Sequence, residues 1–202
     1  MRWRTVSDVN LPNAITLSRL VLTGVFVAGT AAGTTAGHWI ALVSFVIAAV
    51  SDFLDGWLAR RMNLVTSMGK LLDPLADKIL VSAAFIYLSA QGLCPVWVTV
   101  LIISREFLVT GLRQIAVEAG QVLAADQLGK WKTTFQLAFC ITGLLHFAFL
   151  SLDTNNSVVS AFQAFSNPDN WFLPTFMWLA LILTVWSGWN YTWRSRGLLK
   201  SK

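Results

Sequence analysis

The chain has 202 residues, of which 55% are hydrophobic and only 12% are charged, and its mean hydropathy is +0.62. Soluble domains carry about 25% charged residues, so this composition excludes an ordinary soluble protein and indicates an integral membrane protein. The formal net charge of +5 would favour a nucleic-acid partner in a soluble chain. In a membrane protein, the positions of the basic residues are more informative than their sum.

Long apolar segments occur six times along the chain. A helix needs about 20 mostly apolar residues to cross a bilayer, so the sequence predicts an all-α bundle of about six transmembrane helices. The expected spans are 13–31, 38–59, 71–90, 95–117, 131–152 and 171–193. They leave no room for a soluble domain, and residues 1–202 are therefore expected to form a single integral-membrane domain.

The basic residues are distributed asymmetrically about these spans. All 15 Lys and Arg fall on one side of the expected topology, and the connections near 32–37, 91–94 and 153–170 carry none. Cytoplasmic loops carry the excess of Lys and Arg, so both termini are predicted to face the cytoplasm.

Three further segments have predicted roles outside the chemistry. Residues 1–12 contain Trp3 between two arginines, which is typical of an interfacial segment. The connection 153–170 is polar at both ends and apolar in the middle, and we expect a short interfacial helix there. The last span is rich in Leu and Trp and carries no charged residue until Arg194, which favours a packing or dimerisation surface.

Four aspartates provide the strongest functional signal. Asp52 and Asp55 lie three residues apart on the second expected helix, and Asp73 and Asp77 lie four apart on the third. These spacings place each pair on one helix face, and both pairs are expected at a matched depth of about 6–12 Å below the interface. Charges at such depth pair with one another or bind a cation. Four carboxylates form a hard oxygen site suited to Mg²⁺, Mn²⁺ or Ca²⁺, and two ions with a phosphate-bearing ligand fit the charge better than one.

The residues around the aspartates suit a phosphate ligand. Gly56 and Gly69 lack side chains where a bulky ligand could approach the backbone, and Arg60 offers a bidentate fork for phosphate. In an alternative interpretation, the acids only pair with neighbouring bases, namely Arg60, Lys70 and Lys78. That alternative does not explain why so many charges lie below the interface.

A second polar set indicates an anionic co-substrate. Arg105 and Arg113 are eight residues apart and share roughly one face of the fourth expected helix, and Lys130 and Lys132 lie at the start of the fifth. Cations of this kind bind a phosphate well, although anchoring to anionic lipid is an alternative for the two lysines. At the cytoplasmic end of the first helix, Asn13, Thr16 and Arg19 share one face and are either structural residues or additional ligand contacts.

The acidic pattern resembles the signature of the CDP-alcohol phosphotransferase family. The chain reads Asp52-x-x-Asp55-Gly56-x-x-Ala59-Arg60, then eight residues, then Gly69-x-x-x-Asp73-x-x-x-Asp77, and every signature position is present. The resemblance implies a membrane-embedded transferase that moves a phosphatidyl or similar group from a CDP-linked donor to an alcohol and releases CMP. It also implies a homodimer. We expect the site to be open to the cytoplasm, and the membrane to be a bacterial inner membrane.

The resemblance implies a role for each signature residue. The four aspartates would hold the divalent cations, Mg²⁺ or Mn²⁺ and two in number, with Asp77 also acting as general base. The donor CDP-diacylglycerol would be bound by six residues: Asp52, Gly56, Ala59, Arg60, Gly69 and Asp73.

The segments outside the signature point to the acceptor. These segments resemble the branch of the family that acts on sn-glycerol 3-phosphate. They are N-L-P-N-A-I-T-L-S-R in the first helix and the segments around Arg105 and Lys130. Arg19, Arg105, Arg113 and Lys130 would then bind the acceptor phosphate, with Asn13, Thr16 and Lys132 as possible additional contacts. Two alternatives within the family use phosphatidylglycerol, as in a cardiolipin synthase, or inositol phosphate, as in a phosphatidylinositol phosphate synthase.

An ion-coupled membrane transporter is the distant alternative, because intramembrane acids also mark ion pathways. Transporter sites usually lie near the bilayer midplane between inverted repeats. The sequence has no such repeat, and its acids lie toward one leaflet.

Overall fold

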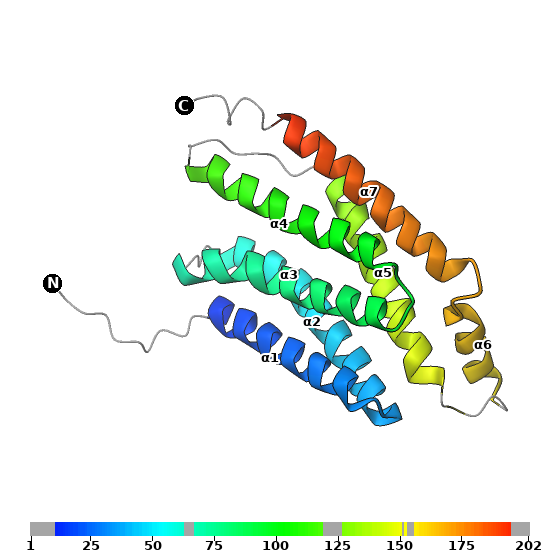
Figure 1. The fold of residues 1–202 in the computed structure, drawn as a ribbon. Helices are drawn as coiled ribbons and strands as arrows, with labels where there is room; N and C mark the ends of the chain where they lie inside the picture. The colour runs from blue at the N-terminus through cyan, green and yellow to red at the C-terminus, as the bar shows by residue number, and fades with distance from the viewer. Residues whose placement is uncertain (1–10, 63–66, 119–126, 151, 153–155, 195–202) are drawn as a thin grey trace. The chain divides into compact units, whose positions relative to one another are not determined.

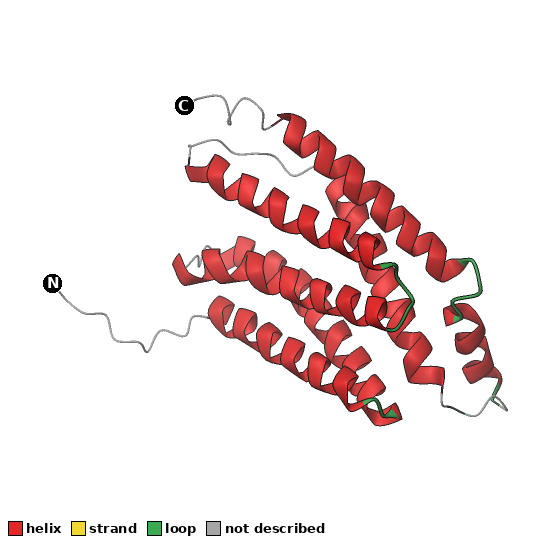
Figure 2. Ribbon diagram, viewed as in Figure 1, coloured by secondary structure: helices red, strands yellow, loops and turns green. Residues whose placement is uncertain are grey.

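A computed structural model describes residues 11–62, 67–118, 127–150, 152 and 156–194 of this chain. Side chains are described for residues 17–51, 78–117, 128–150, 152 and 156–193. The described residues form seven helices and no strand, as Figure 2 shows. The all-α prediction is therefore confirmed for this part of the chain.

Six helices are long and one is short. The helices are α1 Leu11–Ala32, α2 Thr35–Met62, α3 Ser67–Ala90, α4 Val96–Glu118, α5 Gln127–Leu150, α6 Ser157–Ser166 and α7 Phe172–Arg194 (Figure 1). The long helices have 22 to 28 residues, and at 1.5 Å per residue the shortest of them is about 33 Å long. Each long helix coincides with one predicted span to within a few residues. The short helix α6 confirms the helix expected within 153–170.

Within the part of the chain whose side chains are described, two of the long helices meet the criteria for a transmembrane span by length and composition. They cover Leu128–Leu150 and Phe172–Trp193, each with a mean hydropathy of 1.5. Large apolar side chains are exposed on every long helix, for example Val21, Val43 and Trp186. Several polar side chains are buried at the same time, including Arg19, Glu106 and Lys132. An apolar exterior over a partly polar interior suits a protein surrounded by lipid.

The ends of the helices follow from local sequence. Gly92 follows α3 with a φ of 80°, and the amides of Gly92 and Leu93 donate to the carbonyls of Ser89 and Leu88 at 3.0 Å each. This is the Schellman pattern, in which a glycine in the left-handed conformation ends a helix. Thr34 caps the start of α2, because its hydroxyl accepts a hydrogen bond from the Gly37 amide at 3.0 Å.

The chain divides into two compact units, residues 1–80 and 81–202, and each is described by itself. In the first unit, α1 packs against α2. The contact is close because a Cβ on Gly29 would lie 2.7 Å from the Gly37 carbonyl oxygen and 3.0 Å from the Ala41 nitrogen. Small residues allow helix backbones to approach in this way in membrane proteins. Phe26 and Phe45 pack beside this contact, with ring centroids 5.8 Å apart.

In the second unit, α5 packs against α6 and α7, and α4 packs against α7. The end of α3 joins this core through Phe85, whose ring stacks on Phe139 of α5 at 5.3 Å. Leu88 lies over Gly143, where a Cβ would come within 2.7 Å of its Cδ2 atom. These two apolar contacts hold the end of α3 against α5.

The close approach of α1 and α2 generates a stability prediction. Gly29→Ala should lower the free energy of unfolding by about 1–3 kcal/mol, because the new methyl group has only backbone atoms to displace. Gly24→Ala is the matched control on the same helix, since a Cβ there meets nothing within 4 Å among the described residues. Thermal unfolding of both variants in detergent measures the difference. Equal stability of the two variants would contradict the packing described here.

Candidate active site

The acidic pattern lies on two helices. Asp52 and Asp55 fall within α2, and Asp73 and Asp77 fall within α3, as the spacing predicted. The side chains of residues 52–77 lie outside the described part of the structure, so the cage they were predicted to form stays a prediction. The same holds for the remaining signature residues, Gly56, Ala59, Arg60 and Gly69. Among the side chains that are described, no three His, Cys, Asp or Glu cluster as metal ligands would.

Arg19 on α1 is buried, with 2% of its surface exposed. The hydroxyl of Thr23, one turn later, donates to the Arg19 carbonyl at 2.8 Å. A guanidinium group that extended to the interface to reach water would be exposed. The burial of Arg19 therefore favours a role inside the protein. Asn13 and Thr16 share its helix face, but their side chains lie outside the described residues.

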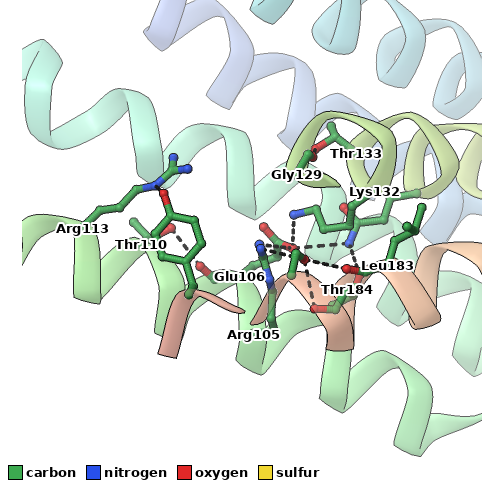
Figure 3. A network of polar contacts seen from close by, with 12 residues as sticks. Arg105, Glu106, Thr110, Arg113, Gly129, Lys132, Thr133, Leu183 and Thr184 are labelled. Carbon is green, nitrogen blue, oxygen red and sulfur yellow. Dashed lines mark hydrogen bonds and ion pairs between the residues drawn. The ribbon is translucent and has the colours of Figure 1, made fainter. Parts of the chain in front are cut away.

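A buried charge cluster centres on Glu106 of α4 (Figure 3). Its carboxylate pairs with the Lys132 ammonium group from α5 and lies 3.4 Å from Nη1 of Arg105. The Nε2 amide nitrogen of Gln136, one turn beyond Lys132, donates to the same carboxylate oxygen at 3.4 Å. Glu106 and Lys132 are only 6% and 4% exposed. Buried charges need such partners, because an isolated charge in an apolar interior costs several kcal/mol.

This cluster gives Lys132 a partner within the protein. The side chain was expected at the cytoplasmic end of its helix, as a possible contact for the acceptor or for anionic lipid. The structure buries it against Glu106, which lies 26 residues earlier on another helix. Helix α5 also begins at Gln127, earlier than the predicted 131, so Lys130 and Lys132 both lie within it. Lys130 is exposed, and its role toward an acceptor stays a prediction.

Helix α7 supplies neutral polar partners to the α4 arginines. Nη2 of Arg105 donates to the Ser187 hydroxyl at 2.9 Å. Nε of Arg113 donates to the Tyr191 hydroxyl at 2.9 Å, and the Arg113 Cζ atom lies 5.1 Å from the centroid of the Tyr191 ring. The last span was expected to provide only a packing or dimerisation surface, and that expectation missed this polar face. One signal in the sequence could have revealed this polar face. It is the spacing of four residues along one helix face: Thr184, Ser187, Gly188 and Tyr191.

Arg105 and Arg113 therefore lie in different surroundings on one helix. The Arg105 side chain is 13% exposed and touches Glu106, whereas Arg113 is exposed and lies apart from the Glu106 cluster (Figure 3). Among the described side chains, one carboxylate lies between the Arg105 and Lys132 cations, so the charges described in this cluster sum to a net positive value. Such an arrangement can bind an anion more readily than a cation.

A helical membrane protein with an acidic pattern on two helices and basic side chains on a third has the features of a CDP-alcohol transferase. The sequence profile of the CDP-alcohol phosphatidyltransferase family matches residues 9–186, and the chain belongs to this family. The family predicted from the acidic signature is thus confirmed.

Several curated relatives carry one name, CDP-diacylglycerol–glycerol-3-phosphate 3-phosphatidyltransferase. The protein of that name from Bacillus subtilis (strain 168) is 40% identical over 204 aligned residues, which cover 95% of this chain and 98% of the relative. The Haemophilus influenzae protein is 32% identical and covers 94% of this chain and 95% of its own length. The Mycoplasma pneumoniae protein is 34% identical over 79% of this chain and 74% of its own length.

The Glu106 cluster generates a prediction on stability. Glu106→Gln leaves the Lys132 charge buried without its carboxylate, and Lys132→Met leaves the carboxylate without its ammonium group. Each single change should lower the free energy of unfolding by about 3 kcal/mol, while the double variant should lose much less than the sum. Unfolding of the four proteins in detergent measures the coupling. Losses that simply add would contradict a direct buried pair.

Proposed function

We propose that the protein transfers the phosphatidyl group of CDP-diacylglycerol to sn-glycerol 3-phosphate, giving phosphatidylglycerol phosphate and CMP. The observation that carries the proposal is the complete acidic signature on α2 and α3, within a family match that covers residues 9–186. The names of the relatives from three bacteria support sn-glycerol 3-phosphate as the acceptor. The family match does not support the transporter alternative, because the family consists of transferases.

We further propose that α1 to α5 and α7 cross the membrane, with both termini in the cytoplasm and the site open to it. The helix lengths and the one-sided distribution of the basic residues support this topology. Residues 1–12 and α6 would lie at opposite interfaces. Because the family match runs through both units, we propose that residues 1–202 form one membrane domain. The bacterial origin of the relatives favours an inner membrane as its location. The family resemblance implies a homodimer.

In this proposal Asp52, Asp55, Asp73 and Asp77 hold two divalent cations. The donor set fits, because four carboxylates supply the hard oxygen ligands that Mg²⁺ and Mn²⁺ prefer. The chemistry that the bound cations supply is neutralisation of the diphosphate charge, which stabilises departing CMP. Gly56, Ala59, Arg60 and Gly69 hold the cytidine and diphosphate of the donor beside them.

Asp77 is the proposed general base. It accepts the proton of the primary hydroxyl of the acceptor while that oxygen attacks the phosphorus atom that bears the diacylglycerol group. The phosphoanhydride bond between this phosphorus and CMP breaks, and CMP leaves with the bonding electron pair. A carboxylate at a metal site is a weak base, so holding the hydroxyl close to the phosphorus supplies much of the rate.

The acceptor phosphate is assigned to the basic side chains. Arg105 and Arg113 of α4, Lys130 of α5 and the buried Arg19 of α1 are the proposed contacts, with Asn13, Thr16 and Lys132 as further candidates. Guanidinium groups bind phosphate bidentately. The excess of positive over negative charge among the described side chains near Arg105 supports an acceptor that already carries a phosphate.

One assay tests the function. Purified protein is incubated with CDP-diacylglycerol, Mg²⁺ or Mn²⁺, and separate acceptors: sn-glycerol 3-phosphate, phosphatidylglycerol, inositol phosphate and glycerol. CMP and the lipid product are measured. We expect product with sn-glycerol 3-phosphate and little with the others. Product with only phosphatidylglycerol or inositol phosphate would assign the protein to one of the alternative acceptors.

The control variant for this assay is Asp77→Asn. It keeps the size of the side chain while removing its basicity, so turnover should fall at least about a hundredfold with thermal unfolding unchanged. Substantial remaining activity would remove Asp77 as the base without affecting the choice of acceptor.

A further inference from the structure

One edge of the Arg113 guanidinium group is hydrogen-bonded to a tyrosine, and the other edge is exposed. Its Nε atom donates to the Tyr191 hydroxyl at 2.9 Å, and its guanidinium carbon lies 5.1 Å from the centroid of the same ring. Within the described part of the chain, neither terminal nitrogen of Arg113 has a hydrogen-bond partner, and the side chain is exposed. Tyr191 itself is 6% exposed. A buried tyrosine thus fixes the inner edge of the guanidinium group and leaves the outer edge available.

Arg105 lies against the same face of α7. Its Nη2 atom donates to the Ser187 hydroxyl, which in turn donates to the Leu183 carbonyl at 2.6 Å. The next residue, Gly188, provides the space for the Arg105 side chain, because a Cβ there would lie 3.0 Å from the Arg105 Cγ atom and 3.8 Å from Nε. The Arg105 Nε atom is buried and has no hydrogen-bond partner among the described residues. A buried donor of this kind is costly unless a ligand satisfies it.

The three α7 residues form one surface. They share one helix face, because Gly188 lies three residues before Tyr191 and Ser187 lies four residues before it. That face lies against α4. Two contacts from one helix therefore fix two arginines of another, and the pairs run in the same order along both helices. Arginine side chains are otherwise flexible, and fixing both before a ligand binds reduces the entropy lost on binding.

We propose that this α7 surface, and Tyr191 above all, positions the α4 guanidinium groups to bind the phosphomonoester of the acceptor. The inference rests on the proposed function, because it takes the acceptor to be a phosphorylated alcohol. Tyr191 is a positioning residue in this account: it acts through Arg113, whose two terminal nitrogens bind the phosphate. Ser187 and Gly188 act in the same way through Arg105. Helix α7 thereby contributes to acceptor selection through Ser187, Gly188 and Tyr191.

Tyr191→Phe is the first test, because it removes the hydroxyl and keeps the ring beside Arg113. We expect the KM for sn-glycerol 3-phosphate to rise about threefold to tenfold, as the loss of one hydrogen bond allows. The KM for CDP-diacylglycerol and the kcat should change by less than about twofold. Tyr87→Phe is the matched control, since Tyr87 is the only other tyrosine in the chain, and it should behave as the wild type.

A double variant separates positioning from a general structural effect. If Tyr191 acts through Arg113, Tyr191→Phe should have no further effect on the acceptor KM in an Arg113→Ala background. The same increase in both backgrounds would overturn the proposal, as would an unchanged KM in the single variant. Gly188→Ala is the independent variant for Arg105, and its added methyl group should also raise the acceptor KM selectively. Gly24→Ala is its control.

A binding measurement distinguishes failure of this inference from failure of the proposed function. Equilibrium binding of inorganic phosphate to the purified protein does not require turnover, and Tyr191→Phe should weaken it by a similar factor. If the wild type gives no product from sn-glycerol 3-phosphate but Tyr191→Phe weakens phosphate binding, the function is wrong and the positioning surface stands. If the wild type is active and both proteins bind phosphate equally, the function stands and the positioning surface is wrong.

Discussion

The buried carboxylate of Glu106 organises the second unit of this protein. It lies on α4, pairs with Lys132 of α5, and contacts Arg105, which in turn reaches Ser187 of α7. Gln136 extends the same network from α5 to Thr184 of α7 at 3.3 Å. Apolar packing between these helices is nonspecific in direction, whereas charged hydrogen bonds require a defined geometry. The network therefore fixes how the three helices face one another and, with them, where the α4 arginines lie.

In the proposed function, the chemistry is divided between two sets of residues. The acids of α2 and α3 are assigned to the cations and the CDP-linked donor, and the basic residues of α4 and α5, with Arg19 of α1, to the acceptor phosphate. Both sets lie in helices with apolar exteriors, where a charge is maintained only by a partner or a ligand. A single physical constraint, the cost of burying charge in an apolar interior, explains why Lys132 needs Glu106, and it supports the proposal that the four aspartates hold metal ions.

The sequence predicted the helices and the family more fully than it predicted the contacts of the second polar set. Long apolar runs with few charges identify helices directly, and the regular spacing of the aspartates identified the family. The partner of Lys132 was not foreseen, because Glu106 lies on a different helix and the hydropathy pattern does not reveal which faces meet. Tyr191 and Ser187 were missed for a different reason. Neutral polar residues in a helix rich in Leu and Trp barely change its hydropathy, and their importance appears only when the α4 arginines are seen against them.

Arg113 is proposed to bind the phosphate of the acceptor, and the kinetics of Arg113→Ala with both substrates varied are the decisive test of that role. Charge-assisted hydrogen bonds to phosphate contribute about 1.5–3 kcal/mol, or roughly tenfold or more in affinity. The account therefore predicts an increase of at least about tenfold in the KM for sn-glycerol 3-phosphate, with the KM for CDP-diacylglycerol nearly unchanged. The opposite result, an increased KM for the donor with an unchanged KM for the acceptor, would place Arg113 at the donor site and contradict the account.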